Sequence, residues 1–199
     1  MKRIVAATIL FGSIWGLLEC SVGDFLHKYN SSYIMTIMAI SLMAVTRHVY
    51  KSKGMQAAMA LIAASLRHFN PIGGCLICAS IAIAIEGIIF ETIWLLPWKK
   101  YESYTMKVSM GIISFYLIYA IGYISTQILT PFIFSKFYLR DLLAIIPRIL
   151  SRSSIVGIVG GVIHPLTYME IRFKIDDRLF YTASAAITAV CWLAIIYGI

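Results

Sequence analysis

The chain has 199 residues, of which 60% are hydrophobic and only 13% are charged. Soluble globular proteins are about 45–50% apolar and about 25% charged, so this composition excludes a water-soluble domain. The net charge is +8, but the basic residues lie between apolar runs. That placement excludes a nucleic-acid-binding surface, which needs basic residues gathered in one patch, and it is typical of loops that contact lipid headgroups.

Apolar runs of about 18 or more residues predict helices that cross the lipid bilayer. In chain order, the predicted segments are 4–25, 33–49, 55–66, 72–97, 108–134, 155–169 and 179–199. Residues 137–152 alternate basic and apolar residues, which favours a helix lying in the membrane interface over a crossing. No linker divides the chain. We therefore predict an all-α fold, a polytopic transmembrane helix bundle of six to seven spans, as a single domain over residues 1–199.

The distribution of lysine and arginine predicts the orientation of the bundle. With the N-terminus inside, the cytoplasmic loops carry about eleven of these residues and the outer loops about six, as expected from the positive-inside rule. The first segment begins like a signal peptide, but Glu19 follows too soon and no cleavage site appears. We expect a retained first helix and a multi-pass protein of the cell membrane with a cytoplasmic N-terminus.

Small residues recur four apart in three segments, as Gly12-x-x-x-Gly16, Ala60-x-x-x-Ala64 and Gly157-x-x-x-Gly161. Such ridges let two helix backbones approach closely in lipid. They indicate packing within the bundle or, alternatively, docking of a partner membrane subunit.

Acidic residues inside the apolar segments are the strongest functional signal. An ionised residue at the bilayer centre costs about 2.5–3.5 kcal/mol on insertion scales, so it usually faces the bundle interior or a cavity. Glu86 lies near the middle of its segment with no Lys or Arg close in sequence, and Glu19 lies deep in the first segment. Glu91 is about 140° further round the helix from Glu86. Asp24 and His27 come later and are interpreted as solvated loop residues.

Two further positions interrupt apolar segments. Arg67 and Asn70 precede Pro71, which ends a helix, and the next helix would begin there with an N-terminus that favours anions. His164 precedes Pro165 within the sixth segment and can bind a proton, a metal or a carboxylate. Either position can equally be structural. Residues 67–71 can form a plain outer loop, and His164 can be an interior histidine whose hydrogen bonds are made within the bundle.

Recognisable catalytic motifs are absent from the sequence. The four histidines are scattered without zinc-binding spacing, and no nucleophile elbow, ATP-binding loop or dinucleotide fingerprint occurs. We expect no metal and no cofactor, and the absence of these motifs favours a protein that is not an enzyme. The exception is Cys75-x-x-Cys78, which has the spacing of thiol-disulfide oxidoreductases but also suits small apolar packing residues.

The size, the short helices, the small-residue ridges and the deep acids resemble the substrate-binding (S) components of energy-coupling-factor vitamin and metal transporters. The resemblance implies that Ala60-x-x-x-Ala64 and the Gly12/Gly16 ridge are candidate docking faces. It also implies candidate ligand contacts at Trp15, Glu19, Asn70 and Glu86. It covers the whole chain but includes no diagnostic motif. Seven crossings depart from the usual six, and the histidine signature of the cobalt and nickel members is absent, which counts against a metal substrate.

The leading hypothesis is therefore a transport component that binds a small solute or ion inside the bundle. Its predicted binding residues are Glu19, Arg67, Asn70, Glu86 and His164. Two alternatives stay open: a membrane enzyme of the thiol-disulfide oxidoreductase type, and a non-catalytic membrane subunit whose acids hold helices together. The expected partners are the lipid bilayer, a small solute or ion, and a partner membrane subunit or a second copy of the chain.

Overall fold

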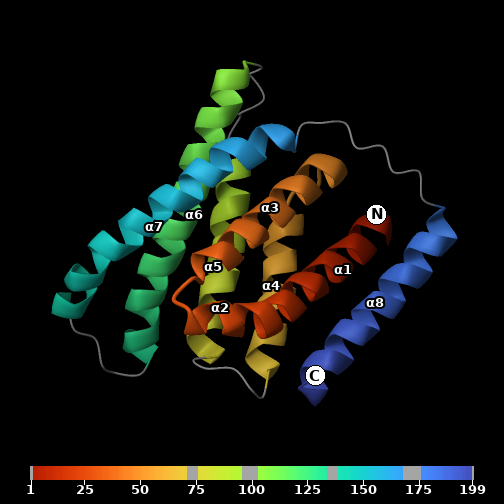
Figure 1. Cartoon of the computed structure of the whole chain (residues 1–199). Helices are drawn as coiled ribbons and strands as arrows, with labels where there is room; N and C mark the ends of the chain where they lie inside the picture. The colour runs from red at the N-terminus through yellow and green to blue at the C-terminus, as the bar shows by residue number, and fades with distance from the viewer. Residues whose placement is uncertain (1, 71–75, 96–102, 134–138, 168–175, 199) are drawn as a thin grey trace.

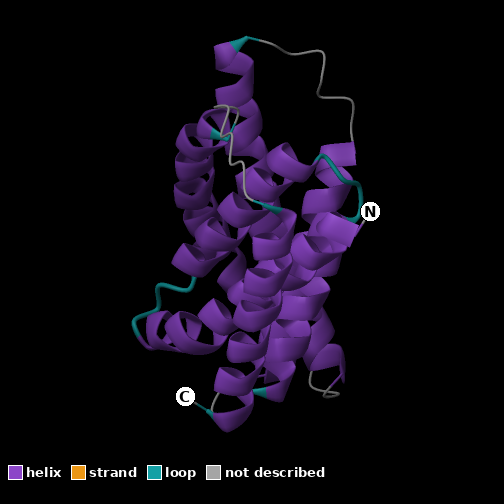
Figure 2. Cartoon of the chain, turned by 90° about the vertical axis from the view of Figure 1, so that its right-hand side faces the viewer, coloured by secondary structure: helices purple, strands orange, loops and turns teal. Residues whose placement is uncertain are grey.

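The computed structural model describes residues 2–70, 76–95, 103–133, 139–167 and 176–198, and all regular secondary structure in these ranges is helical. The first rod of the bundle is continuous and consists of α1 (Lys2–Leu18), the π-helical turn η1 (Glu19–Gly23) and α2 (Asp24–Lys28). The other helices are α3 (Tyr33–Tyr50), α4 (Met55–Phe69), α5 (Leu76–Leu95), α6 (Tyr104–Ile133), α7 (Leu139–Leu166) and α8 (Asp177–Tyr197) (Figure 1). The predicted all-α bundle is confirmed (Figure 2).

Six helices are long and apolar enough to cross a membrane, as expected for a multi-pass membrane protein. The spans are Lys2–Leu26, Tyr33–Tyr50, Ile77–Leu95, Tyr104–Pro131, Leu143–Leu166 and Asp177–Tyr197. One more long helix, α4, is not among these spans. It has only 15 residues, or about 22 Å of helix, which is shorter than the roughly 30 Å hydrocarbon core. It contacts α1 and α5.

The prediction of a separate interfacial helix over 137–152 is wrong for the described part of that segment, because residues 139–152 form the first half of α7. Pro147 lies inside this helix without ending it. The reason is a buried stripe at helical spacing, in which Ile149, Ser153 and Val156 are at most 3% exposed. The neighbouring Arg148 is exposed on another face.

The Gly12/Gly16 ridge is filled by α4 of the same chain. A Cβ atom at Gly12 would lie 2.9 Å from the carbonyl oxygen of Met59, and one at Gly16 would lie 2.7 Å from the side chain of Leu66. Both distances are too short for ordinary contact, so only glycine permits this approach of α1 to α4.

The other two ridges are also used inside the bundle. Ala60 lies against Gly87 of α5 so closely that a Cβ atom on Gly87 would overlap the Ala60 side chain. Gly157 and Gly161 pack against Ile112 of α6. All three ridges therefore serve packing within the chain, which is the first of the two predicted uses.

The last helix lies beside the first, and the two run in the same direction (Figure 1). The indole Nε1 of Trp192 in α8 donates a hydrogen bond of 3.0 Å to the hydroxyl of Ser13 in α1. Near the N-terminus, Arg3 forms an exposed ion pair of 3.0 Å with Asp177. These contacts close the bundle on the side away from α6 and α7.

Candidate functional site

A cavity of about 330 Å³ lies at the end of the bundle where the first rod passes from α1 into α2. Its volume is at the lower end of the range of small-molecule sites. Three of the five predicted binding residues line it, namely Glu19, Arg67 and Glu86. The remaining polar lining comes from Asp24, Ser32, Thr36, Tyr123, Thr126, Gln127 and Thr130, and much of the apolar wall from Met35, Ala79, Ala82 and Ile83.

Glu86 comes from the middle of α5 and is 3% exposed. The hydroxyl of Thr36 in α3 donates a hydrogen bond of 2.9 Å to its Oε1 atom. Across the cavity wall, Gly122 of α6 leaves room for this side chain, because a Cβ atom there would lie 3.1 Å from Glu86 Cγ. Glu86 is thus held by one hydroxyl in a space that Gly122 keeps clear.

Glu19 begins the π-helical turn η1. The indole Nε1 of Trp15, one turn earlier, donates a hydrogen bond of 3.1 Å to Glu19 Oε1. A Cβ atom at Gly23 would lie 3.2 Å from the other carboxyl oxygen, so glycine again provides the room. Single π-helical turns inside α-helices are rare and occur frequently at functional sites, and this one carries a cavity-lining acid.

Arg67 is 7% exposed and holds the rim of the cavity together. Its guanidinium forms an ion pair with Asp24 and donates a second hydrogen bond of 3.2 Å to the backbone carbonyl of Glu19. Asn70, 4% exposed, donates to the other carboxyl oxygen of Asp24 at 3.5 Å. Asp24, interpreted from sequence as a solvated residue, is therefore part of the site, and that interpretation is wrong.

The predicted helix start after Pro71 lies outside the described residues. Arg67 and Asn70 both donate to the carboxylate of Asp24 in the same chain. Asn70 contributes through this contact and does not line the cavity.

Sequence reasoning missed the wall that α6 provides. Tyr123, Thr126, Gln127 and Thr130 all line the cavity and follow the i, i+3, i+4, i+7 spacing of one helical face. A polar stripe of that period in an otherwise apolar helix was a signal in the sequence. The Tyr123 hydroxyl donates a hydrogen bond of 2.9 Å to Ser32, which joins α6 to the start of α3.

His164 lies away from this cavity. It is fully buried near the C-terminal end of α7, and its ring meets Trp94 of α5 edge to face, with centroids 5.0 Å apart. Pro165 is in the last turn of the helix rather than in the middle of a span. His164 does not line the cavity with Glu19 and Glu86.

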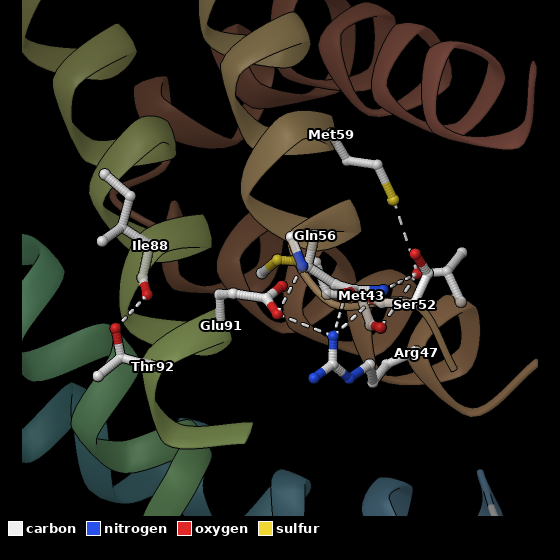
Figure 3. Close-up of polar contacts among 10 residues, drawn as sticks. Met43, Arg47, Ser52, Gln56, Met59, Ile88, Glu91 and Thr92 are labelled. Carbon is white, nitrogen blue, oxygen red and sulfur yellow. Dashed lines mark hydrogen bonds and ion pairs between the residues drawn. The ribbon is translucent and has the colours of Figure 1, made fainter. Parts of the chain in front are cut away.

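A second buried polar cluster lies where α3 ends and α4 begins (Figure 3). Arg47 forms an ion pair of 2.8 Å with Glu91 and also donates to the Ser52 carbonyl at 2.6 Å and to Gln56 Oε1 at 3.2 Å. The backbone N–H of Gly54 donates to the same Glu91 oxygen at 2.8 Å. Glu91 therefore ties α5 to the α3–α4 turn, on a different face from Glu86.

The cysteines fall into two states. Cys78 is disulfide-bonded and lines the cavity, whereas Cys20 and Cys191 are free. Cys75, the other half of the C-x-x-C motif, lies outside the described residues.

Within the described ranges, no three His, Cys, Asp or Glu side chains are grouped so that they could hold a metal ion. The cavity thus combines two acids that have no ion pair with a described base, an internal Arg67–Asp24 pair, a polar stripe and an apolar wall. Comparisons with models of protein families, with curated proteins and with solved structures find no match to this chain.

Proposed function

We propose that this protein is an integral membrane transport component that binds a small solute in the cavity beside Glu86. The observation that carries the proposal is the presence of Glu19, Arg67 and Glu86 on the wall of one cavity, although they come from three helical rods. Ionisable residues at membrane depth are costly, and they commonly mark substrate or ion pathways. The site lies in a multi-pass bundle, where solutes cross between helices.

Unsatisfied polar atoms support the same proposal. Arg67 Nε and Thr130 Oγ1 belong to residues that line the cavity, and both are buried without a hydrogen-bond partner in the described part of the chain. Buried polar atoms are normally paired by protein or water, so such exceptions need an explanation. A solute or ordered water at this wall supplies one.

The proposal extends to partners and location. The chain has no ATP-binding motif, so a nucleotide-driven step needs separate subunits, as in the energy-coupling-factor transporters that the sequence resembles. A partner subunit would dock on a surface other than the three glycine and alanine ridges, which are filled inside the chain. We place the protein in the cell membrane with its N-terminus in the cytoplasm, on the basis of its loop charges.

The test is to identify small molecules that co-purify with the full chain and to measure their Kd in variants. Glu86→Gln and Glu19→Gln keep the oxygen that accepts from Thr36 or Trp15, so the fold should persist. Removing a buried, hydrogen-bonded charge costs 2–5 kcal/mol or more in binding, so we expect Kd to rise by roughly thirtyfold or more.

The matched control is Asp177→Asn, which removes an exposed carboxylate at the start of α8 and should leave Kd unchanged. Unaltered affinity in both glutamine variants would contradict the proposal.

The second candidate, a thiol-disulfide oxidoreductase, rests on the disulfide-bonded Cys78 at the cavity wall. Exchange requires an accessible disulfide and a thiolate that attacks it. Trapping with an alkylating probe in intact membranes would then show Cys75 and Cys78 cycling between oxidised and reduced forms. If the two thiols stay permanently reduced and Cys78→Ser is silent, this candidate fails.

A further inference from the structure

We propose that the ligand of the cavity is a small organic ammonium ion with an apolar body, whose charge is held by Glu19 and Glu86. This inference rests on the proposed function and deepens it by naming the class of solute. It follows from the charge balance of the lining residues, from the hydrogen bonds that already fix the two acids, and from the apolar lining beside them.

The charge balance favours a cation. Among the described lining residues, the acids are Glu19, Asp24 and Glu86 and the base is Arg67. Arg67 forms its ion pair with Asp24, so two carboxyl groups are left without an ion pair among the described residues. An ionised carboxylate at this depth requires a counter-charge, and a bound cation provides it.

One further base lies nearby. Arg152 of α7 is close to the hydroxyls of Tyr119 and Tyr123, but it does not line the cavity. It therefore stands beside the polar α6 wall and does not replace a ligand cation between the two glutamates.

The oxygen atoms available as ligands favour an ammonium ion over a metal ion. Calcium takes six to eight oxygen ligands, and magnesium requires a nearly ideal octahedron, whereas no three His, Cys, Asp or Glu side chains among the described residues are grouped so that they could hold a metal ion. A primary ammonium has three N–H donors. Each glutamate has one oxygen that already accepts from Trp15 or Thr36, which fixes the carboxyl group and leaves its second oxygen for the ligand.

The apolar lining favours an organic body. Ala79, Ala82 and Ile83 of α5 and Met35 of α3 give the cavity an apolar side. At about 330 Å³ the space is far larger than a single inorganic ion needs. Small-molecule sites are typically apolar with a few placed polar groups, and this cavity has that composition.

The experiment uses three probes that share one ring and differ in charge: cyclohexylammonium, cyclohexanol and cyclohexanecarboxylate, with Mg²⁺ as a fourth. Binding to the full chain in lipid nanodiscs is measured by ligand-observed NMR, and for Mg²⁺ by calorimetry. Because charge-assisted hydrogen bonds are the strong ones, we expect cyclohexylammonium to bind at least about tenfold more tightly than cyclohexanol. Glu86→Gln and Glu19→Gln should each remove that preference, and Asp177→Asn should preserve it.

The possible failures are distinguishable. If cyclohexanol, cyclohexanecarboxylate or Mg²⁺ binds as well as the ammonium, or if the preference survives both glutamine variants, the ammonium assignment is overturned while solute binding stands. If none of the four probes binds, and no solute co-purifies with the chain, both the assignment and the proposed function are overturned.

Discussion

Replacing Glu91 with alanine should lower the free energy of unfolding by about 3–5 kcal/mol, which is the usual loss when one partner of a buried ion pair is removed. Glu91 and Arg47 are each only 11% exposed at the side chain. Without the carboxylate, the guanidinium stays buried with no counter-charge, and the N–H of Gly54 loses its acceptor. Unfolding in SDS, followed by tryptophan fluorescence, measures the change.

The control is the exposed pair of Arg3 and Asp177, whose side chains are 42% and 68% exposed. Solvent screens such a pair, so Asp177→Ala should lower stability by less than about 1 kcal/mol. The double variant Arg47→Met/Glu91→Leu removes both charges together and should recover most of the loss, since an apolar pair of similar volume can replace a buried ion pair. Equal losses for Glu91→Ala and Asp177→Ala would contradict a buried role for Glu91.

The Arg47–Glu91 ion pair also shows that two kinds of buried acid look alike in the sequence. Glu91 has its own arginine and a backbone donor, whereas among the described residues Glu86 has a single hydroxyl donor, and it faces a cavity. The first is explained by holding helices together, which was the alternative of a structural subunit. The second also joins two helices, through Thr36, but it does so from the wall of a cavity, and for that reason the function is sought at Glu86.

The helices were predictable because a bilayer requires long apolar segments with internally satisfied backbones. The inward position of Glu19, Arg67 and Glu86 was also predictable, since ionisable residues at membrane depth usually face the bundle interior or a cavity. The Arg67–Asp24 ion pair was not, because its partners are 43 positions apart and only tertiary packing unites them. Nor does any residue pattern predict the π-helical turn that carries Glu19.

Other sequence-based interpretations have the same physical limit. The spacing of Gly12 and Gly16 predicts that some backbone approaches closely, but it does not say whether that backbone belongs to the same chain, and here α4 fills the ridge. His164 was grouped with the acids because it precedes Pro165 within an apolar segment and can bind a carboxylate, yet it packs on Trp94. Local spacing thus predicts which contacts a residue can make, whereas the neighbours that tertiary packing brings to it determine which contacts it does make.

Arg67→Met should destabilise the protein by about 3 kcal/mol, at the lower end of the range for buried pairs because the Asp24 side chain is 26% exposed. The variant also leaves Asp24, Glu19 and Glu86 at one cavity with no lining base among the described residues. Unfolding in SDS again measures the loss, and Arg148→Met, which changes an exposed arginine of α7, is the control with little expected effect.

The double variant Arg67→Met/Asp24→Asn separates the two roles of this arginine. Neutralising Asp24 removes the uncompensated charge, so stability should return to within about 1 kcal/mol of the wild type. Solute affinity should not return, because Arg67 also donates to the backbone carbonyl of Glu19 and thereby fixes the π-helical turn that presents this acid. A double variant that regains full affinity would show that Arg67 acts only as the partner of Asp24. One that stays as unstable as Arg67→Met would show that the ion pair is not the source of the stability.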